Sequence, residues 1–243
     1  MIGPEITTER FGRPFRQYPA AVSAEAMGLA WARQEEAPHG AVVVVDREIS
    51  ARGRLGRVWW APAETTLACA VVLRPAIAAE EADVSWLAGG VIAAAGVESL
   101  TGLAAATWWP DGVVDPETEQ ELGMVKAETQ LGPGRVRSAV VGLRLDLGRL
   151  GLGAERREEL LEAVAGAVDD LDLGSSDSAT ATAAAYQRRC TLLGRRVRLV
   201  LLPKGETRGV ARRVDPSARL ELESATGMVE RITIDMLRTL EVI

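Results

Sequence analysis

One short stretch, residues 48–62 (EISARGRLGRVWWAP), concentrates the residue types suited to binding an anion. Guanidinium groups donate hydrogen bonds in a geometry that suits phosphate and carboxylate. Glycines let the backbone approach a ligand closely. The run of four valines just before this stretch is typical of a buried strand. We therefore predict a ligand-binding loop after a strand, built from Arg52, Gly53, Arg54, Gly56 and Arg57.

The alternative is an exposed basic turn, which is the commoner fate of a run of charges. Trp59, Trp60 and Pro62 follow the arginines directly. Two tryptophans and a proline are out of place in a plain solvated turn, so they favour the binding loop.

This stretch resembles the glycine-arginine loop of biotin protein ligases, whose usual form is Gly-Arg-Gly-Arg-x-Gly-Arg-x-Trp with a proline soon after. Only the first glycine differs, and Ala51 stands in its place. In that family the loop folds over biotin and its adenylate. The resemblance therefore implies that Arg52, Arg54, Arg57 and Trp59 lie at the adenylate.

Composition limits the remaining possibilities. The chain has 243 residues, 47% of them hydrophobic, which is enough for one full domain and a small second one. Its formal net charge is -6, so we expect no nucleic-acid partner and regard the arginine loop as a local positive site. Only two lysines occur, Lys126 and Lys204, so chemistry that needs a lysine has few candidates.

Cysteines and histidine give no sign of a metal centre. Cys69 and Cys190 are far apart and are expected to be buried thiols in a reducing compartment. His39 has no serine or cysteine partner nearby, so we expect a structural turn residue. The sequence shows no signal peptide and no long uninterrupted apolar span. We therefore expect a cytoplasmic protein with no membrane partner.

The elements that must position the loop can be predicted from periodicity. Prolines at positions 4, 14 and 19 predict an irregular arm over residues 1–20. Apolar spacing predicts helices over 23–36, 80–101 and 154–168. Buried strands are predicted over 41–45 and Thr66–Leu73, and the small polar residues 174–182 predict a linker.

Three positions before the arginines also differ from the family's pattern. Where the family has Ser-Thr-Asn at the start of the first helix, this chain has Ser23, Ala24 and Glu25. Ser23 is kept and is expected both to cap the helix and, by resemblance, to contact biotin. Glu48 stands where the family has glutamine.

Two further motifs of the family are altered, and the lysine of the first has become Trp108. The family's Lys-Trp-Pro-Asn-Asp corresponds to residues 108–112, in which Trp109 and Pro110 match while Asp111 and Gly112 do not. The resemblance gives Trp109 a binding role. The strand that follows has Glu121 where the family has its catalytic lysine. Lys126 is a weak substitute, because the five-residue spacing puts it on the opposite face of a strand.

The strand at 138–147 also differs from the family pattern, in which two glycines and an asparagine recur. Its second glycine is Arg144 and its asparagine is Asp146. A glycine there lets a ligand lie against the strand, whereas an arginine fills that space.

Residues 188–199 again resemble the family closely, at the start of its C-terminal domain. Short alternating strands follow, with turns near 203–205, 215–217 and 226–227, and favour a small β-barrel. The predicted fold is α+β: a mixed β-sheet flanked by helices over residues 21–182, and an SH3-like barrel over 188–243.

The resemblance implies ATP- and Mg-dependent attachment of biotin to a lysine of a biotin carboxyl carrier domain, by way of biotinyl-adenylate. A homodimer is compatible with the sequence. Two anionic reactants need fixed positive charge. Acidic residues instead occupy family positions 25, 48, 111, 121 and 146. Replacing the lysine by Glu121 reverses a contact worth roughly 4 kcal/mol at about 4 Å and an effective dielectric near 20.

Three hypotheses follow. In the first, the chain is a working ligase rebuilt around Arg52, Arg54, Arg57 and Lys126. In the second, it is a ligase-like scaffold of weak or lost activity, whose new acids pair with Arg144 and the retained arginines. In the third, it binds a different small ligand, such as a cation, or a carboxylase partner. Fold-level analogy does not choose among them. The charge reversal favours the second.

Overall fold

A computed structural model describes residues 7–175 and 177–243. Its larger part is an eight-stranded mixed sheet in the order β1-β2-β3-β4-β8-β7-β6-β5, in which β2 and β3 are parallel and all other neighbours are antiparallel. The strands are β1 (Thr8–Arg10), β2 (Arg13–Tyr18), β3 (Val42–Val45), β4 (Thr66–Leu73), β5 (Ala106–Trp108), β6 (Gly112–Val114), β7 (Glu121–Gly132) and β8 (Arg135–Asp146).

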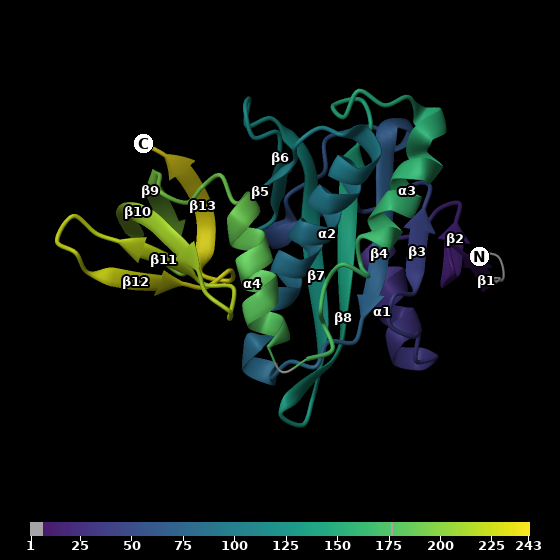
Figure 1. The fold of residues 1–243 in the computed structure, drawn as a ribbon, viewed down its shortest axis with the longest axis horizontal. Coiled ribbons are helices and arrows are strands. Elements are labelled where there is room, and N and C mark those ends of the chain that lie inside the picture. The colour runs from purple at the N-terminus through teal and green to yellow at the C-terminus, as the bar shows by residue number, and fades with distance from the viewer. Residues whose placement is uncertain (1–6, 176) are drawn as a thin grey trace.

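Helices cover both faces of this sheet (Figure 1). One face carries α1 (Ala24–Gln34). The other carries α2 (Val84–Thr101), α3 (Arg157–Gly166) and α4 (Ser178–Arg189). Short 3-10 turns lie at Arg54–Gly56, Ala63–Thr65, Ala79–Glu81 and Ala154–Arg156. The predicted mixed sheet with flanking helices is therefore confirmed.

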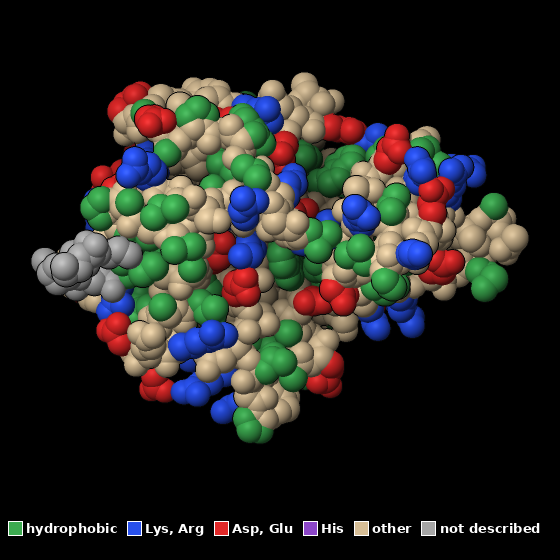
Figure 2. Space-filling model, turned by 180° about the vertical axis from the view of Figure 1, so that it is seen from behind, with side chains coloured by type: hydrophobic (Ala, Val, Ile, Leu, Met, Phe, Trp, Pro, Cys, Tyr) green, Lys and Arg blue, Asp and Glu red, His purple; other side chains and the backbone are tan. Residues whose placement is uncertain are grey.

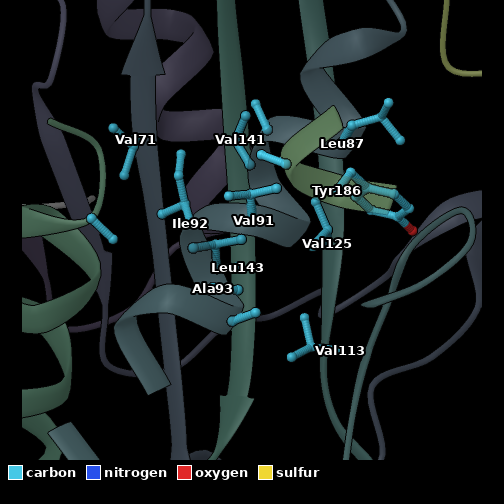
Figure 3. Packing of buried hydrophobic residues seen from close by; sticks show 14 of the residues in the cluster. Val71, Leu87, Val91, Ile92, Ala93, Val113, Val125, Val141, Leu143 and Tyr186 are labelled. Atoms are coloured by element: carbon cyan, nitrogen blue, oxygen red, sulfur yellow. The ribbon is translucent and has the colours of Figure 1, made fainter. Parts of the chain in front are cut away.

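Alternation along β8 decides which side chains face which helix. Val140 lies against Gly28 of α1, and Val141 lies against Gly89 of α2. Even-numbered positions of this strand therefore face α1, and odd-numbered positions face the α2 layer. Figure 3 shows Val71, Val125 and Val141 packed beneath Ile92 and Val91 of α2. Burying each such side chain contributes about 1.5–3 kcal/mol.

Helix α2 is long and apolar enough to cross a membrane by length and composition alone, but 67% of it is buried inside the protein. It packs on the sheet and between α3 and α4 as a core helix. On the face of the molecule in Figure 2, acidic and basic side chains are interspersed and neither sign forms a continuous patch.

The C-terminal part is a five-stranded antiparallel sheet in the order β12-β11-β10-β9-β13. No pairing joins its two edge strands among the described residues, so the predicted closed SH3-like barrel is not confirmed. Trp109 fastens this sheet to the larger one, because its indole nitrogen donates to the carbonyl of Ala218 at 3.0 Å. The strands are β9 (Arg196–Leu201), β10 (Glu206–Val214), β11 (Leu220–Glu223), β12 (Val229–Ile232) and β13 (Leu237–Val242).

Two predictions about irregular segments are wrong. Most of the described part of the predicted arm, residues 7–20, forms β1 and β2. The prolines do not prevent this, because Pro14 stands near the start of β2 and Pro19 just after its end, where neither breaks the pairing with β3. The predicted linker over 174–182 overlaps α4, whose small residues pack closely on α2. An added Cβ at Gly90 would meet the ring of Tyr186 at 2.9 Å. Residues 1–6 of the arm and residue 176 of the linker lie outside the described residues.

Candidate functional site

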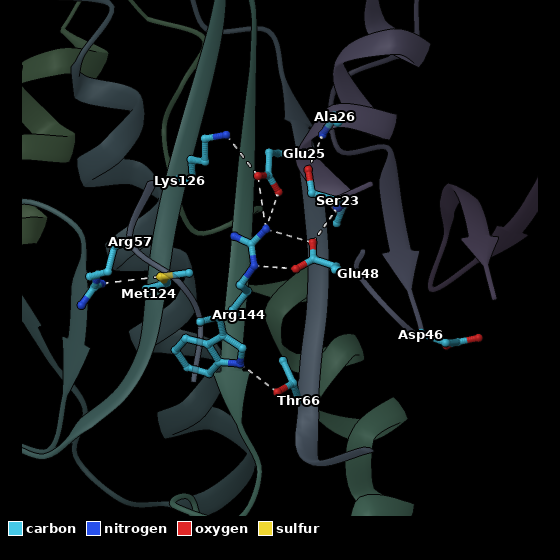
Figure 4. Close-up of polar contacts among 12 residues, drawn as sticks. Ser23, Glu25, Ala26, Asp46, Glu48, Arg57, Thr66, Met124, Lys126 and Arg144 are labelled. Carbon is cyan, nitrogen blue, oxygen red and sulfur yellow. Dashed lines mark hydrogen bonds and ion pairs between the residues drawn. The ribbon is translucent and has the colours of Figure 1, made fainter. Parts of the chain in front are cut away.

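Arg144 lies at the centre of a buried group of charges (Figure 4). Its even-numbered position on β8 directs the side chain toward α1, where it is 1% exposed. Its Nε donates to Glu48 Oε2 at 2.5 Å, and its Nη2 donates to Glu48 Oε1 at 3.0 Å. Nη2 also reaches both oxygens of Glu25, at 3.0 and 3.2 Å. We call Glu25, Glu48 and Arg144 the buried cluster.

Local structure places the two carboxylates. Ser23 is the N-cap of α1, as predicted, and its hydroxyl accepts a hydrogen bond from the Ala26 amide at 3.2 Å. Glu25 follows in the first turn and lies over Gly142, where an added Cβ would be 3.0 Å from its carboxylate. Glu48 accepts from the Ala24 amide at 2.8 Å and so also caps α1. The space above the remaining glycine of β8 is therefore filled by Glu25.

Electrostatics in this cluster are finely balanced. Burial raises the pKa of Glu48 above its ordinary value, against the opposing attraction of Arg144. The pKa of Arg144 is raised, because burial is outweighed by the two carboxylates beside it. Lys126 contacts Glu25 at 3.3 Å and Glu128 at 3.0 Å. Glu25, Glu48, Arg144 and Lys126 together carry no net charge.

Lys126 lies on β7 directly opposite Gly142 of β8, within reach of Glu25. Its pKa is raised: burial alone would lower it, but the neighbouring Glu128 and Glu25 stabilise the ammonium. Glu121 belongs to a different group of contacts, at the start of the same strand. Lys126 therefore does not stand in for the lysine that Glu121 replaces.

The arginine loop is held by the protein itself. Arg54 donates from Nη1 to the backbone carbonyls of Leu237 and Ile234, which belong to the C-terminal sheet and the turn before it. Burial lowers the pKa of Arg54. The turn places Leu55 and Gly56 at φ of 52° and 75°, and the second value explains the glycine. Gly53 lies against Met124, where an added Cβ would be 2.7 Å from the sulfur.

Arg57 pairs with Asp111 and Glu121, two acids at altered family positions. Its Nη1 lies 2.6 Å from Glu121 Oε1, and its Nη2 lies 3.4 Å from Asp111 Oδ2. Burial raises the pKa of Asp111, with Arg57 and Arg54 opposing. Trp60 also donates to Glu121, at 3.3 Å. We call Arg57 and Glu121 the rim pair, because Arg57 is 43% exposed.

The remaining predicted residues lie apart from these two groups. Trp59 is buried and donates to Thr66 Oγ1 at 2.8 Å. Trp109 is fully buried at the junction between the sheets and cannot contact a ligand in this conformation. Gly112 pairs with Met124 in the sheet, and Asp146 accepts from the Gly148 amide at 2.9 Å, so it caps a turn.

Two cavities remain open in this region. One, of about 290 Å³, lies beside Trp59 and Arg52, and we call it the Trp59 pocket. The other, of about 240 Å³, lies beside Trp108, Asp111 and Glu121. No group of three potential metal ligands among His, Cys, Asp and Glu occurs within residues 7–175 and 177–243.

Several residues of the site were missed. Met124 stands where the family's Lys-Leu-x-Gly motif has its glycine. The alignment that identified Glu121 also shows this replacement, so Met124 could have been found from the sequence. Arg149 lies 3.5 Å over the Trp60 ring and donates to the Glu121 carbonyl at 2.6 Å. Nothing in the pattern indicated Arg149, because its contacts join segments about 30 and 90 residues away.

Comparison with known proteins agrees with this geometry. No model of a known protein family matches the chain. Part of the sequence, 111 residues or 46% of the chain, is 28% identical to the bifunctional ligase/repressor BirA of Bacillus spizizenii, and equally to that of Bacillus subtilis. The aligned part spans 34% of the length of these relatives.

Solved structures match over almost the whole chain. A mutant biotin protein ligase from Aquifex aeolicus, in complex with biotin, superposes with a TM-score of 0.71 at 17% identity, covering 96% of this chain and 99% of that one. A biotin protein ligase-like protein of unknown function from Silicibacter sp. gives 0.64 at 15% identity, covering 95% and 98%. The fold is that of the biotin protein ligases. The shared loop and the partial sequence match make the chain similar to these ligases beyond the fold itself.

Proposed function

We propose that this biotin protein ligase-like protein has weak or no ligase activity, because its own side chains fill the site in which the family forms biotinyl-adenylate. The observation that carries the proposal is the buried cluster. By resemblance, biotin would lie near Ser23 at the start of α1 and against β8 at the position of Arg144. That space holds the Arg144 side chain, the Glu25 carboxylate and Met124.

Displacing these groups is costly. Moving Arg144 aside would leave two buried carboxylates without their counter-charge, and uncompensated buried charges of this kind cost about 3–5 kcal/mol. Biotin would have to recover that energy before it gained any affinity. A rearranged, ligand-bound form of this site is therefore strongly disfavoured.

Phosphate chemistry is opposed as well. The family's lysine would neutralise the α-phosphate of ATP, whereas Glu121 and Asp111 present negative charge there. Arg57, which the resemblance assigns to the adenylate, is already paired with these acids. Arg54 is bound to backbone carbonyls of the C-terminal part. The residues therefore do not fit ATP with Mg.

Titration calorimetry with biotin, ATP and a non-hydrolysable biotinyl-adenylate mimic tests the proposal. We expect no heat of binding for biotin or the mimic at concentrations at which a working ligase is saturated. The companion assay measures transfer of labelled biotin to a biotin carboxyl carrier domain, the partner that the resemblance implies. Tight binding of the mimic, or label transfer at an ordinary turnover, would overturn the proposal.

A restored variant makes the test sharper. Glu25→Asn, Glu48→Gln, Arg144→Gly and Met124→Gly together reopen the space over β7 and β8, and Glu121→Lys returns the positive charge. We expect the fivefold variant to bind the mimic more tightly than the natural chain by at least tenfold. The matched control is Glu128→Gln, which changes an acid on the same strand without opening the site.

The second candidate is a binding role without catalysis, toward a carboxylase partner or a different small ligand. The open Trp59 pocket favours the small ligand, because it survives beside a site that is otherwise closed. A cytoplasmic location and a homodimer remain predictions from the sequence.

A further inference from the structure

We propose that the cavity of about 240 Å³ beside Trp108 binds a small alkylguanidinium compound, whose planar cation pairs with Asp111 and stacks on the indole. We call this cavity the Trp108 pocket. Its volume suits a compound of roughly ten non-hydrogen atoms. The inference goes beyond the proposed loss of ligase activity, because it names a cationic ligand for a cavity that the buried cluster leaves open.

The walls of the Trp108 pocket combine an aromatic side chain with acids. Trp108 ends β5, and Asp111 and Gly112 follow in the tight hairpin that leads to β6. Gly112 pairs with Trp108, and an added Cβ would lie 3.0 Å from the tryptophan Cβ. Because a side chain there would press on Trp108, glycine at this position leaves room for the indole at the wall of the cavity. Glu119 and Glu121 complete the acidic lining.

The acids of the pocket outnumber the basic groups that pair with them. Arg57 is shared between two carboxylates, at 2.6 Å from Glu121 and 3.4 Å from Asp111. Arg195 pairs with Glu119. In the described parts of the chain, no other Lys or Arg lies within ion-pair distance of these three acids. Three carboxylates therefore share two guanidinium groups, and the pocket keeps one negative charge in excess.

Asp111 is the acid that is best placed to receive a ligand. Its side chain is 12% exposed, and Arg57 holds it only at the longer of its two distances. Burial raises the pKa of the Asp111 carboxyl group, and the attraction of Arg57 and Arg54 opposes this rise. Arg54 does not come within ion-pair distance, because its guanidinium donates to backbone carbonyls of the C-terminal part. A cation in the pocket would supply the missing counter-charge.

The chain's own side chains show which kind of cation suits these walls. Both cations that pair with the acids are guanidinium groups, and Arg195 also lies over the Trp108 ring, 5.6 Å from its centroid. A guanidinium donates two parallel hydrogen bonds to a carboxylate and is hydrated more weakly than an ammonium. It also stacks on aromatic rings. The combination of indole and carboxylate therefore favours a guanidinium over an ammonium.

The Trp108 pocket can be occupied while the buried cluster stays intact. None of the residues that line the pocket belongs to the cluster. Figure 4 shows Arg57, which lines the pocket, on the side of Met124 away from Arg144. A ligand in the pocket therefore leaves Arg144 and its two carboxylates in place.

Titration calorimetry on the full chain at pH 8 tests the proposal with butylguanidine as the probe. Butylurea is the neutral isostere, and butylamine is the ammonium counterpart. We expect butylguanidine to bind at least tenfold more tightly than butylurea and at least threefold more tightly than butylamine. Addition of 0.5 M NaCl should weaken butylguanidine binding, because salt screens partly exposed charges.

Variants locate the binding site. Asp111→Asn keeps the size of the side chain but removes its charge, and it should reduce butylguanidine binding at least tenfold. Trp108→Leu removes the aromatic ring and should reduce binding at least threefold. The matched control is Glu117→Gln, which removes an exposed acid from the turn between β6 and β7 that does not line the pocket. It should leave binding within twofold. Circular dichroism and the unfolding midpoint of each variant confirm that the fold is kept.

Three results would each overturn the proposal. In the first, butylguanidine does not bind the natural chain up to about 10 mM. In the second, butylurea or butylamine binds as tightly as butylguanidine. In the third, Asp111→Asn binds butylguanidine as tightly as Glu117→Gln does.

Separate titrations with butylguanidine and with the biotinyl-adenylate mimic distinguish this proposal from the proposed function. Binding of butylguanidine alone supports both. Binding of the mimic alone overturns both. If neither compound binds, the guanidinium site is overturned and the loss of ligase activity stands. If both bind, the loss of ligase activity is overturned and the guanidinium site stands.

Discussion

The buried cluster and the rim pair use the same residue types but differ in how much water reaches them. Arg144 is 1% exposed, and its partners Glu25 and Glu48 are 2% and 4% exposed. Arg57 of the rim pair is 43% exposed. Ion pairs in contact with water contribute about 0–1 kcal/mol, whereas breaking a buried pair from one side costs about 3–5 kcal/mol.

This difference shows which alterations close the site. The rim pair reverses the charge of the phosphate position but can be opened by solvent and salt. The buried cluster occupies space and cannot be opened without stranding charges. The proposed loss of the biotin site would therefore depend more on Arg144 than on Glu121, although Glu121 is the more conspicuous change in the sequence.

Arg144→Met should produce the largest effect. It leaves the carboxylates of Glu25 and Glu48 in a space that water hardly reaches, so we expect the free energy of unfolding to fall by about 3–5 kcal/mol. Urea unfolding followed by circular dichroism measures it. The matched control is the triple variant Glu25→Gln, Glu48→Gln, Arg144→Met, which removes all three charges and should recover most of the loss. A loss below about 1 kcal/mol in the single variant would place Arg144 in the same class as the rim pair.

The sequence predicted those elements whose local residue pattern agrees with the fold. Ser23 caps α1, the predicted strand Thr66–Leu73 is β4, and α2 lies within the predicted helix over 80–101. The predictions of irregular segments were wrong, because composition alone does not show which segments pair within a sheet. The prolines of residues 13–19 suggested an arm, yet the segment between them joins the edge of the sheet beside β3.

At the site, alignment with the family's motifs identified the altered positions, and the second hypothesis expected the new acids to pair with Arg144 and the retained arginines, as Glu25 and Glu48 do with Arg144. Glu25, Glu48 and Arg144 are separated by up to 119 residues, and only the sheet brings them together. The pairing of Asp111 and Glu121 with Arg57 agrees with the expectation that new acids meet retained arginines. Asp146 does not follow it, because its carboxylate caps a turn. Trp109, expected at the ligand, proved to join the two sheets.

Glu48 provides a test of the buried cluster that depends on pH. Burial raises its pKa above the ordinary 4.5, so the native protein retains a proton that the unfolded chain has released. The contribution of Glu48 to stability is therefore complete below pH 4.5 and is lost as the pH rises through the raised pKa. Relative to the natural chain, Glu48→Gln should become progressively more stable as the pH is raised from 4 to 8.

Urea unfolding of both proteins across that range measures this trend. The opposite trend, in which the natural chain gains on the variant with rising pH, would mean that attraction to Arg144 outweighs burial. The buried cluster would then hold a salt bridge more favourable than its geometry indicates.

Arg57→Gln should have a small effect on stability. It removes the contacts with Glu121 and Asp111, but water can solvate the freed Glu121, so we expect a loss of at most about 1 kcal/mol. Thermal unfolding at low and high salt measures it, and 0.5 M NaCl should shrink the difference between the two proteins. A loss as large as that of Arg144→Met would show that the rim is as dry as the cluster.

The smallest effect is expected at Glu206 of β10, which is a solvent-exposed counterpart to Glu48. Its pKa is lowered to about 2 by hydrogen bonds from Arg198 and Arg208. The sign is therefore reversed: the stability that Glu206 contributes is present above its ordinary pKa of 4.5 and is lost as the pH falls toward 2. Carbon-13 NMR titration of the side-chain carboxyl group gives the midpoint directly. In 0.5 M NaCl that midpoint should move back toward 4.5, because solvent ions screen an exposed pair. The titration midpoint of Glu48 should barely move under the same salt, because solvent ions do not reach a buried carboxylate. An equal shift at both residues would show that the buried cluster is screened by solvent ions as much as an exposed ion pair.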